Sequence, residues 1–393
     1  MPELSLPSKK RIESIDMLRG IIMIIMALDH VRDYFHIEAV TGDPTNMATT
    51  TPVLFFTRWI THYCAPNFVF LAGTAAFLTG QKKTKKELSV FLLKRGIFLM
   101  LVDLVIFNLL LTFDPFYQTI AVAVIWVTGC SMVLLAMLIF LPLRMLFIIG
   151  LVLVAGHNYL DRFNAADMMQ GNLLYGFLHQ QHIKMLGNGH MILVFYPWLP
   201  WPGVMILGYC LGTWFVKTVD AAKRKKYLLR TGIITTLAFF VIRYINVYGD
   251  LVPWSTQKNG MYTVLSFFNV TKYPPSLSFL CMTIGPGLIA LAFLENAKAA
   301  WTKIVMIYGK VPMFYYLLHF LLIHSICAII FLANGHSFSE ANTGMMWFRP
   351  NNFGYPLWAV YLIWISVVAF FYPLCKWYSR YKATHDYWWL SYL

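Results

Sequence analysis

Long runs of apolar residues, separated by short polar stretches, recur along almost the whole chain. A run of about 20 apolar residues is the length an α-helix needs to cross a lipid bilayer. The pattern therefore predicts an all-α, polytopic membrane bundle that forms one domain over residues 1–393. The ten predicted helices cover residues 16–36, 53–80, 88–111, 118–140, 143–160, 196–217, 227–248, 275–295, 303–333 and 356–379.

The polar connections alternate between basic and nearly neutral, and this alternation predicts how the helices are oriented. Cytoplasmic loops of membrane proteins are enriched in Lys and Arg. Ten helices with both termini in the cytoplasm place every basic cluster on that side. The basic connections contain Lys9, Lys10, Arg11, Lys82, Lys83, Lys85, Lys86, Arg144, Lys217, Lys223, Arg224, Lys225, Lys226, Lys298, Lys303, Lys376, Arg380 and Lys382. The other connections contain Arg162, Lys184, Lys258, Lys272 and Arg349.

The composition agrees with a membrane protein and argues against other classes. Charged residues make up 12% of the chain and hydrophobic residues 59%, and the mean hydropathy is +0.62. A soluble domain is about 25% charged. The net charge of +14 does not indicate nucleic-acid binding, because the positive-inside rule accounts for the basic loops. The six cysteines are isolated, so neither a disulfide framework nor a metal site is predicted. The first apolar run is too long for a signal peptide and is expected to remain as a helix.

The first apolar segment carries more charge than a simple membrane anchor tolerates. Each ionised group near the bilayer centre costs roughly 2.5–3.5 kcal/mol even on the lenient insertion scale. Such groups normally face a protein interior or a wet cavity, and they indicate a functional site by default. The segment holds Arg19, Asp29, His30, Arg32 and Asp33.

Helical spacing predicts which of these groups lie together. Arg19 and His30 are 11 residues apart, close to three full turns, so they share one face about 16 Å apart along the axis. Asp33 follows His30 by three residues, and Arg32 follows Asp29 by three, so both pairs are within contact range. A histidine oriented by a carboxylate is a candidate general base. The alternative interpretations are a structural polar cluster and, for Arg19, a side chain that reaches the membrane interface.

Further histidines compete for the catalytic role. Arg58 and His62 lie one helical turn apart on the second segment, and Pro66 is expected to interrupt the helix just below them, a common feature where a helix lines a cavity. His62 is thus a second candidate, with a buried structural histidine as the alternative. His36, just beyond the first segment, is either a third candidate or an exposed loop residue.

Two other regions attract attention because of their histidines. His319 and His324 lie loosely on one face of the ninth segment and are expected to line the same cavity. The long outer connection at 161–195 contains several glycines and the residues His179, His182 and His190. A loop of this length is usually functional or a partly buried lid.

The predicted cytoplasmic end offers cations to an anionic ligand from the cytosol. The alternative is ordinary positive-inside charge. The candidates are Lys82, Lys83, Lys94, Arg95 and Arg144.

Several stretches resemble bacterial relatives of heparan-alpha-glucosaminide N-acetyltransferase, a family of membrane acyltransferases. The first is SIDMLRG at 14–20, followed by an apolar run and Asp29-His30. The resemblance covers nearly the whole chain. The further stretches are DPTN at 43–46, RWITHYCAP at 58–66, FVFLAGT at 68–74, PWLPWPGVM at 197–205, NVTKYPPSL at 269–277 and KVPMFYYLLH at 310–319.

The resemblance implies transfer of an acetyl group from cytosolic acetyl-CoA to a sugar amine or hydroxyl on the other side of a bacterial inner membrane. It also makes a homodimer reasonable. Acyltransferase-3 proteins show the same spacing from Arg to His, which falls here on Arg19 and His30. The lysosomal heparan enzyme instead uses a later histidine, for which His36 is the nearest analogue. We prefer His30 because Asp29 and Asp33 lie beside it.

The resemblance leads to a working mechanism. Arg19, Lys94, Arg95 and Arg144 hold the donor, and its long arm reaches His30. His30 removes the acceptor proton, and Asp29 or Asp33 stabilises the imidazolium. Arg32 or Arg58 stabilises the oxyanion. Direct transfer and an acetyl-His intermediate both fit.

Two other functions use the same residues. A proton-coupled transporter or channel would use the buried Asp, His and Arg groups as a relay. A non-catalytic scaffold would use them only to hold helices together. The transporter predicts flux without CoA, and the scaffold predicts no response to any ligand. The visible sequence contains no internal repeat of the kind many transporters have.

Overall fold

The computed structural model describes residues 12–39, 41–165, 167–342, 344–350 and 353–392. The basic residues Lys9, Lys10 and Arg11 lie outside these described residues. The α-helices are α1 (Glu13–Phe35), α2 (Pro52–Thr61), α3 (Cys64–Gly80), α4 (Lys85–Leu101), α5 (Asn108–Thr112), α6 (Val124–Leu138), α7 (Leu143–Gly156), α8 (Leu173–His179), α9 (Trp201–Leu211), α10 (Ala221–Ile245), α11 (Gly260–Phe268), α12 (Leu277–Leu294), α13 (Ala300–Lys310), α14 (Pro312–Ala333) and α15 (Leu357–Thr384). The strands are β1 (Thr119–Val122), β2 (His182–Gly187) and β3 (His190–Val194). A π-helical turn, η1 (Val102–Phe107), joins α4 to α5, and short 3₁₀ turns are η2 (His157–Phe163), η3 (Gly212–Phe215), η4 (Phe338–Glu340) and η5 (Trp388–Ser391).

The chain is a helical membrane protein. Every apolar segment predicted from the sequence contains helix. Among the described residues, five helical stretches are long and apolar enough to cross a bilayer. They are Leu143–Phe163, Ala221–Ile245, Leu277–Leu294, Pro312–Ala333 and Leu357–Thr384. Of the other apolar segments, α1 is a continuous helix of 23 residues that carries several charged side chains, and the rest form shorter or interrupted helices.

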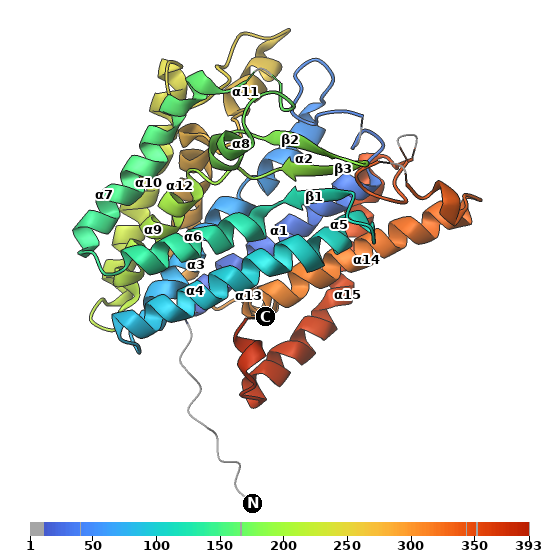
Figure 1. Cartoon of the computed structure of the whole chain (residues 1–393). Helices are drawn as coiled ribbons and strands as arrows, with labels where there is room; N and C mark the ends of the chain where they lie inside the picture. Colours follow the sequence, from blue (N-terminus) through green and yellow to red (C-terminus); the bar gives the residue numbers. More distant parts are fainter. Residues whose placement is uncertain (1–11, 40, 166, 343, 351–352, 393) are drawn as a thin grey trace, which may run out of the picture.

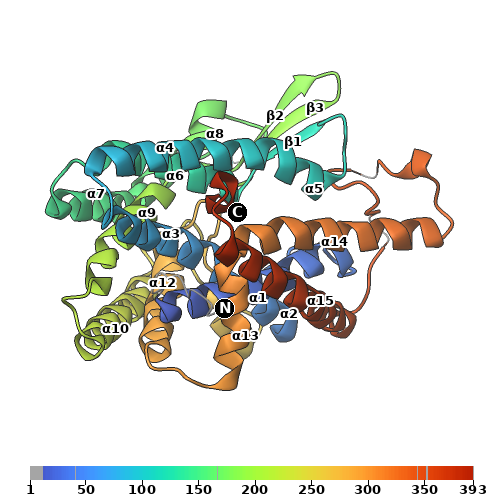
Figure 2. The same cartoon turned by 90° about the horizontal axis from the view of Figure 1, so that it is seen from below.

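Two predicted helices are each divided into two. The prediction of one helix at 303–333 is wrong, because the chain turns at Val311 and α14 begins at Pro312. Proline lacks a backbone N–H and suits the first position of a new helix. In Figure 2, α13 runs at a steep angle to α14. The predicted helix at 53–80 breaks at His62 and Tyr63. Pro66 lies within the first turn of α3, so the break precedes it.

A small sheet is added to the predicted all-α bundle and replaces the first part of one predicted helix. The predicted helices at 118–140 and 196–217 start only at Val124 and Trp201. Before Val124 the chain forms β1 of a three-stranded sheet of order β1-β3-β2, whereas residues 196–200 form an irregular turn after β3. β1 pairs with β3 in parallel, and β2 with β3 antiparallel. The outer connection at 161–195 thus supplies α8 and two strands.

Buried polar groups in the predicted helix at 88–111 anchor this sheet. The Asn108 amide donates to the Ala121 carbonyl at 2.9 Å and accepts from the Ala121 N–H at 2.6 Å. An Asp103 oxygen accepts from the Ala123 N–H at 3.0 Å. Asp103 lies within the π-helical turn η1 and Asn108 follows it directly, and such turns are frequent at functional sites. These residues therefore fix the point where β1 passes into α6.

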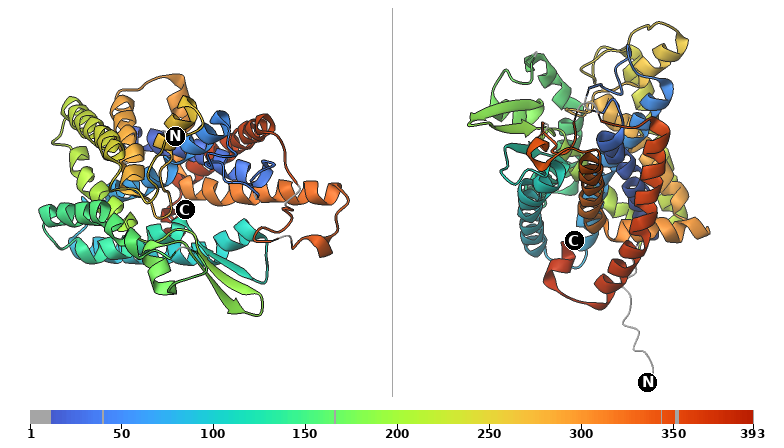
Figure 3. Two further views of the ribbon diagram at one scale, coloured as in Figure 1. Left: turned by 90° about the horizontal axis from the view of Figure 1, so that it is seen from above. Right: turned by 90° about the vertical axis from the view of Figure 1, so that its right-hand side faces the viewer.

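The elements run between two ends of the molecule, and the basic connections gather at one of them (Figures 1 and 3). At this basic end, Ser14 donates to Glu295 at 2.5 Å, and Arg224 pairs with the same carboxylate. Lys85 donates to the Phe140 carbonyl at 3.1 Å. The sheet, α8 and α11 lie at the opposite end (Figure 1). The arrangement agrees with the alternation seen in the sequence.

Glycines allow the helices around α1 and α3 to approach closely. A Cβ on Gly20 of α1 would lie 1.8 Å from the Val305 carbonyl oxygen of α13. A Cβ on Gly208 of α9 would lie 1.9 Å from the Phe70 oxygen of α3. Neither site has room for a larger residue. These contacts hold α1 and α3 as the wall of the cavity described next.

Candidate active site

One cavity of about 640 Å³ runs along α1 and is lined by residues from both ends of the molecule. Arg19 lines it toward the basic end, and Asp29 and His30 line it toward the sheet. This confirms the prediction that Arg19 and His30 share a face of one helix. Between them the walls are largely apolar, with Phe68 and Met132 among the lining residues. Volumes of 300–1,000 Å³ are usual for small-molecule sites.

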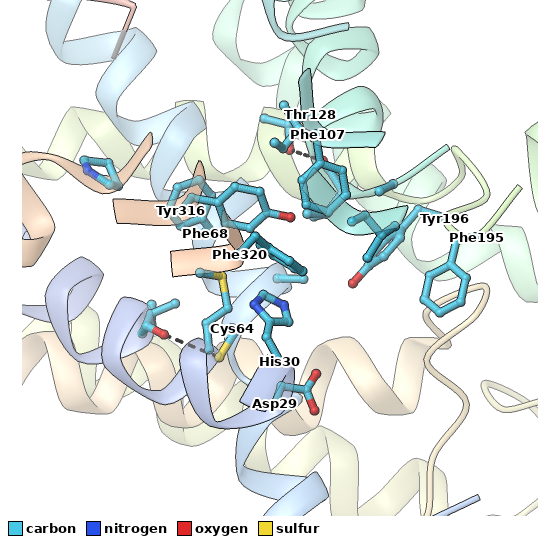
Figure 4. A pocket seen from close by; sticks show the side chains of 18 of the residues that line it. Asp29, His30, Cys64, Phe68, Phe107, Thr128, Phe195, Tyr196, Tyr316 and Phe320 are labelled. Carbon is cyan, nitrogen blue, oxygen red and sulfur yellow. Dashed lines mark hydrogen bonds between the residues drawn. The ribbon is translucent and has the colours of Figure 1, made fainter. Parts of the chain in front are cut away.

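His30 lies in an aromatic part of the cavity (Figure 4). Its ring centroid is 4.1 Å from that of Phe320 and 6.1 Å from that of Tyr316. Its Nδ1 is 2.7 Å from Nε2 of His319, which is fully buried on α14. The expectation that His319 and His324 line the cavity is wrong for the described residues: His319 contacts the cavity only through His30, and the His324 ring nitrogens lie 3.0 and 2.8 Å from the carbonyls of Leu110 and Trp347. The aromatic rings restrict how the His30 side chain can rotate.

Asp29 is the centre of an ion-pair cluster. Arg58 donates to both of its carboxylate oxygens at 2.6 and 2.5 Å, and the Thr61 hydroxyl donates at 2.9 Å. Arg32 lies 3.0 Å from the same carboxylate, as the spacing predicted. Lys272 approaches to 3.8 Å. All five side chains line the cavity, so α1, α2 and the 269–276 connection meet here.

Asp33 lies beside this cluster but its partner is not His30. Arg32 donates to Asp33 at 2.5 Å, and the Asp33 side chain is 43% exposed. Both residues line the cavity. His30 and Asp33 therefore both lie along the cavity wall. Within the described part of the chain, no hydrogen bond joins their side chains.

The two other catalytic candidates lie outside the cavity wall. His62 ends α2, is 3% exposed and packs 5.3 Å from the Phe279 ring. His36 follows α1 and is buried. Its side chain accepts a hydrogen bond from the Glu38 N–H at 3.3 Å, and its backbone carbonyl accepts one from Arg349 at 2.8 Å. Neither is among the described residues that line the cavity. The histidine at 36 is therefore not the exposed loop residue that one interpretation expected.

Aromatic side chains at the end of the outer connection at 161–195 form part of the cavity wall. Two of its histidines bond to groups outside this wall. Phe195 and Tyr196, which follow β3, line the cavity (Figure 4). His179 pairs with Asp161 at 2.8 Å, and His190 bonds to the Tyr117 carbonyl at 3.2 Å. The connection is thus folded into α8, β2 and β3, and residues at the end of β3 form part of the cavity wall.

Toward the basic end, three cations line the cavity: Arg19, Arg95 and Lys382. Arg19 donates to the Gly309 carbonyl at 3.3 Å and to Asp16 at 3.2 Å. Of the residues predicted to bind the donor, Lys94 and Arg144 are exposed and are not among the described lining residues. The structure separates neighbouring Arg95 and Lys94, because successive residues of a helix point about 100° apart.

The cavity is also lined by five residues that helical spacing did not mark as site residues. They are Lys272, Lys382, Tyr196, Tyr273 and Tyr316. Lys272 and Tyr273 belong to the stretch NVTKYPPSL, whose resemblance to the acyltransferases marked them. Lys382 lies outside these stretches, and in the sequence it is indistinguishable from the other basic residues of the predicted cytoplasmic connections. No grouping of His, Cys, Asp and Glu suited to a metal ion occurs among the described residues.

The molecule is a helical membrane protein with a cavity that follows α1 from Arg19, toward the basic end, to His30. The chain matches the family model "Heparan-alpha-glucosaminide N-acetyltransferase, catalytic" over residues 11–255, and it belongs to this family. Membership implies an acetyltransferase. No curated protein matches the chain.

Proposed function

We propose that the protein transfers an acetyl group from cytosolic acetyl-CoA to an amine or hydroxyl of a glycan sugar on the opposite side of a bacterial inner membrane. One observation carries the proposal: a single cavity contains cations toward one end and His30 toward the other. A donor from one side and an acceptor from the other can meet in such a cavity without either crossing the membrane completely.

The cations toward the basic end fit the phosphates of CoA. Arg19, Arg95 and Lys382 come from three different helices and converge on the cavity. Arg and Lys bind phosphate through charge-assisted hydrogen bonds. The apolar middle of the cavity suits the pantetheine arm, which has to extend about 16 Å to bring the thioester from Arg19 to His30.

His30 is the proposed general base. In direct transfer, its Nε2 takes the proton of the acceptor as the acceptor nitrogen or oxygen attacks the thioester carbonyl. The C–S bond then breaks, and the CoA thiolate leaves and takes a proton. In the other route Nε2 of His30 attacks the thioester carbonyl, the C–S bond breaks, the CoA thiolate leaves and an acetyl-His forms. The acceptor then attacks the acetyl carbon, the imidazole leaves, and the acceptor proton passes to the thiolate. Both routes use the same nitrogen, Nε2, which takes the acceptor proton in direct transfer and bonds to the carbonyl carbon in the acetyl-His route.

Asp29 and Asp33 act indirectly in this proposal, because each carboxylate pairs with arginine side chains and holds them in place. The carboxylate of Asp29 is already engaged by Arg58, Arg32 and Lys272, so little of its charge is available to an imidazolium at His30. Its proposed role is to hold these cations in place. Arg32 or Arg58, held in this way, stabilises the negative charge on the carbonyl oxygen in the transition state. We keep His62 and His36 as structural residues in this proposal.

The proposed topology has ten membrane crossings with both termini in the cytoplasm. The supporting observation is the concentration of Lys and Arg at one end of the molecule. Arg19, Arg95 and Lys382 then lie toward the cytosol, where acetyl-CoA is made, and the sheet faces the outside.

Purified protein in proteoliposomes tests the proposal. Radiolabelled acetyl-CoA is placed on one side and a panel of amino and hydroxy sugars on the other. Labelled sugar is expected from the wild type and at least about 100-fold less from His30→Gln. A covalent label on the wild type without acceptor, absent from His30→Gln, would establish the acetyl-His route. Equal transfer by His30→Gln would contradict the proposed base.

A further inference from the structure

The two histidines His30 and His319 form a directional hydrogen-bond relay. Nδ1 of His319 is 2.9 Å from the carbonyl oxygen of Tyr315, and Nε2 of His319 is 2.7 Å from Nδ1 of His30. A carbonyl oxygen only accepts, so the His319 Nδ1 must carry a proton. A neutral imidazole has one N–H, so its Nε2 is then an acceptor.

His319 is held in a setting that favours the neutral ring. It is fully buried, its ring stacks on Tyr315 at 5.1 Å, and Phe320 lies 4.8 Å away. Among the described residues no carboxylate pairs with it. Burying an unpaired imidazolium is costly, so His319 is an acceptor toward His30.

We propose that His319 is a positioning residue that fixes the tautomer of His30. Because His319 Nε2 accepts, His30 must donate from Nδ1, and its Nε2 then carries the lone pair. Nε2 of His30 makes no hydrogen bond to a described residue, and His30 lines the cavity. The geometry thus prepares one nitrogen to receive a proton or to attack a carbonyl. This inference rests on the proposed function of His30, but its structural part can be measured separately.

The relay takes the place that a carboxylate has in many catalytic triads, where it holds a histidine in one tautomer. Here the backbone carbonyl of Tyr315 defines the direction through a second neutral imidazole. The second imidazole adds no further charge beside His30, and Asp29 remains free to hold its three cations.

Solid-state ¹⁵N NMR of the full chain with labelled histidine tests the tautomer directly. The His30 signals are identified as those lost in His30→Gln. The wild type is expected to show His30 protonated at Nδ1 and unprotonated at Nε2. In His319→Leu the acceptor is gone, so Nδ1 loses its preference for the proton and the signals shift toward the other tautomer. A wild-type His30 protonated at Nε2, or unchanged signals in His319→Leu, would overturn the inference.

Kinetics provide the second readout and a matched rescue. His319→Leu is expected to lower kcat at least about 100-fold while KM for acetyl-CoA stays within about threefold. His319→Gln places an amide oxygen near the former Nε2 and is expected to recover most of kcat and the wild-type tautomer. Equal loss in Leu and Gln, with unchanged acetyl-CoA binding in both, would contradict the relay. Transfer that is absent in the wild type while the tautomer is as expected would instead reject the proposed function.

Discussion

Asp29 shows how a carboxylate can lie in a membrane segment without remaining exposed to lipid. Three cations and the Thr61 hydroxyl surround it, and its side chain is 11% exposed. Removing one member of a buried ion pair is costly because the remaining charges lose their partner. Asp29→Leu is therefore expected to lower the free energy of unfolding by about 3 kcal/mol or more.

Thermal unfolding in detergent measures this loss, with Asp386→Leu as the control because Asp386 is exposed near the end of the chain. The double variant Asp29→Leu/Arg58→Leu is expected to recover part of the stability, because it removes an unpaired charge. A melting temperature of Asp29→Leu equal to that of the control would contradict the account of the cluster.

The structure separates the three catalytic candidates that the sequence left open. His30→Gln is expected to abolish transfer while keeping acetyl-CoA binding, since it changes the wall of the cavity without touching the cations toward the basic end. His62→Gln and His36→Gln are expected to retain turnover within about tenfold after correction for folded protein. His336→Gln serves as the unrelated control, because the half-buried His336 stacks on Phe331 and is not among the described residues that line the cavity. Loss of turnover in His62→Gln alone, with normal folding, would move the catalytic role to His62.

Local spacing predicted contacts within α1 better than contacts between helices. The shared face of Arg19 and His30 and the pairing of Asp29 with Arg32 follow from helical geometry alone. The hydrogen bond from His30 to His319 joins residues 289 positions apart. No periodicity along one segment contains that information, so only the tertiary structure reveals it.

At the scale of elements, α1 and α13 depend on a close backbone contact. A Cβ on Gly20 would come within 1.8 Å of the Val305 oxygen, and a Cβ on Gly309 within 1.9 Å of the Asp16 oxygen. Gly20→Ala is expected to push the helices apart and to cost about 1–3 kcal/mol, as overpacking usually does. Because Arg19 is adjacent and bonds to Gly309, acetyl-CoA affinity is expected to fall as well.

Gly156→Ala is the matched control, because nothing lies within 4 Å of the added carbon. Chemical or thermal unfolding in detergent, together with a binding titration, compares the two variants. If Gly20→Ala were as stable as Gly156→Ala and bound acetyl-CoA equally well, the contact between α1 and α13 would not support the site.

The helices were predictable where apolar runs are long and uninterrupted, and less so where two elements share one run. In the segment at 303–333 apolar residues continue on both sides of the charged residue Lys310, so hydropathy alone does not divide it. β1 and β3 consist of short apolar runs whose periodicity does not distinguish strand from buried helix. Their identity depends on pairing with each other and on Asn108, which hydropathy does not record.

For the whole molecule, the basic end is expected to face the cytosol. Lys86 at the start of α4 and Leu186 in the β2–β3 hairpin are both exposed and lie at opposite ends. A membrane-impermeant maleimide on intact cells is expected to label Leu186→Cys and to label Lys86→Cys only after permeabilisation. Unmodified chain provides the background from its own cysteines. Labelling of Lys86→Cys in intact cells would reverse the proposed topology.

The central claim is that cations from several helices bind acetyl-CoA within the cavity that leads to His30. Calorimetric titration of acetyl-CoA into detergent-purified protein tests it most directly, using Arg95→Gln, the neighbouring Lys94→Gln and ATP as comparisons. The account predicts one saturable site for acetyl-CoA, about tenfold weaker binding in Arg95→Gln from the loss of a charge-assisted contact, and unchanged binding in Lys94→Gln. No saturable binding, or an equal response to ATP, would contradict the account and favour a carrier that uses the same buried charges.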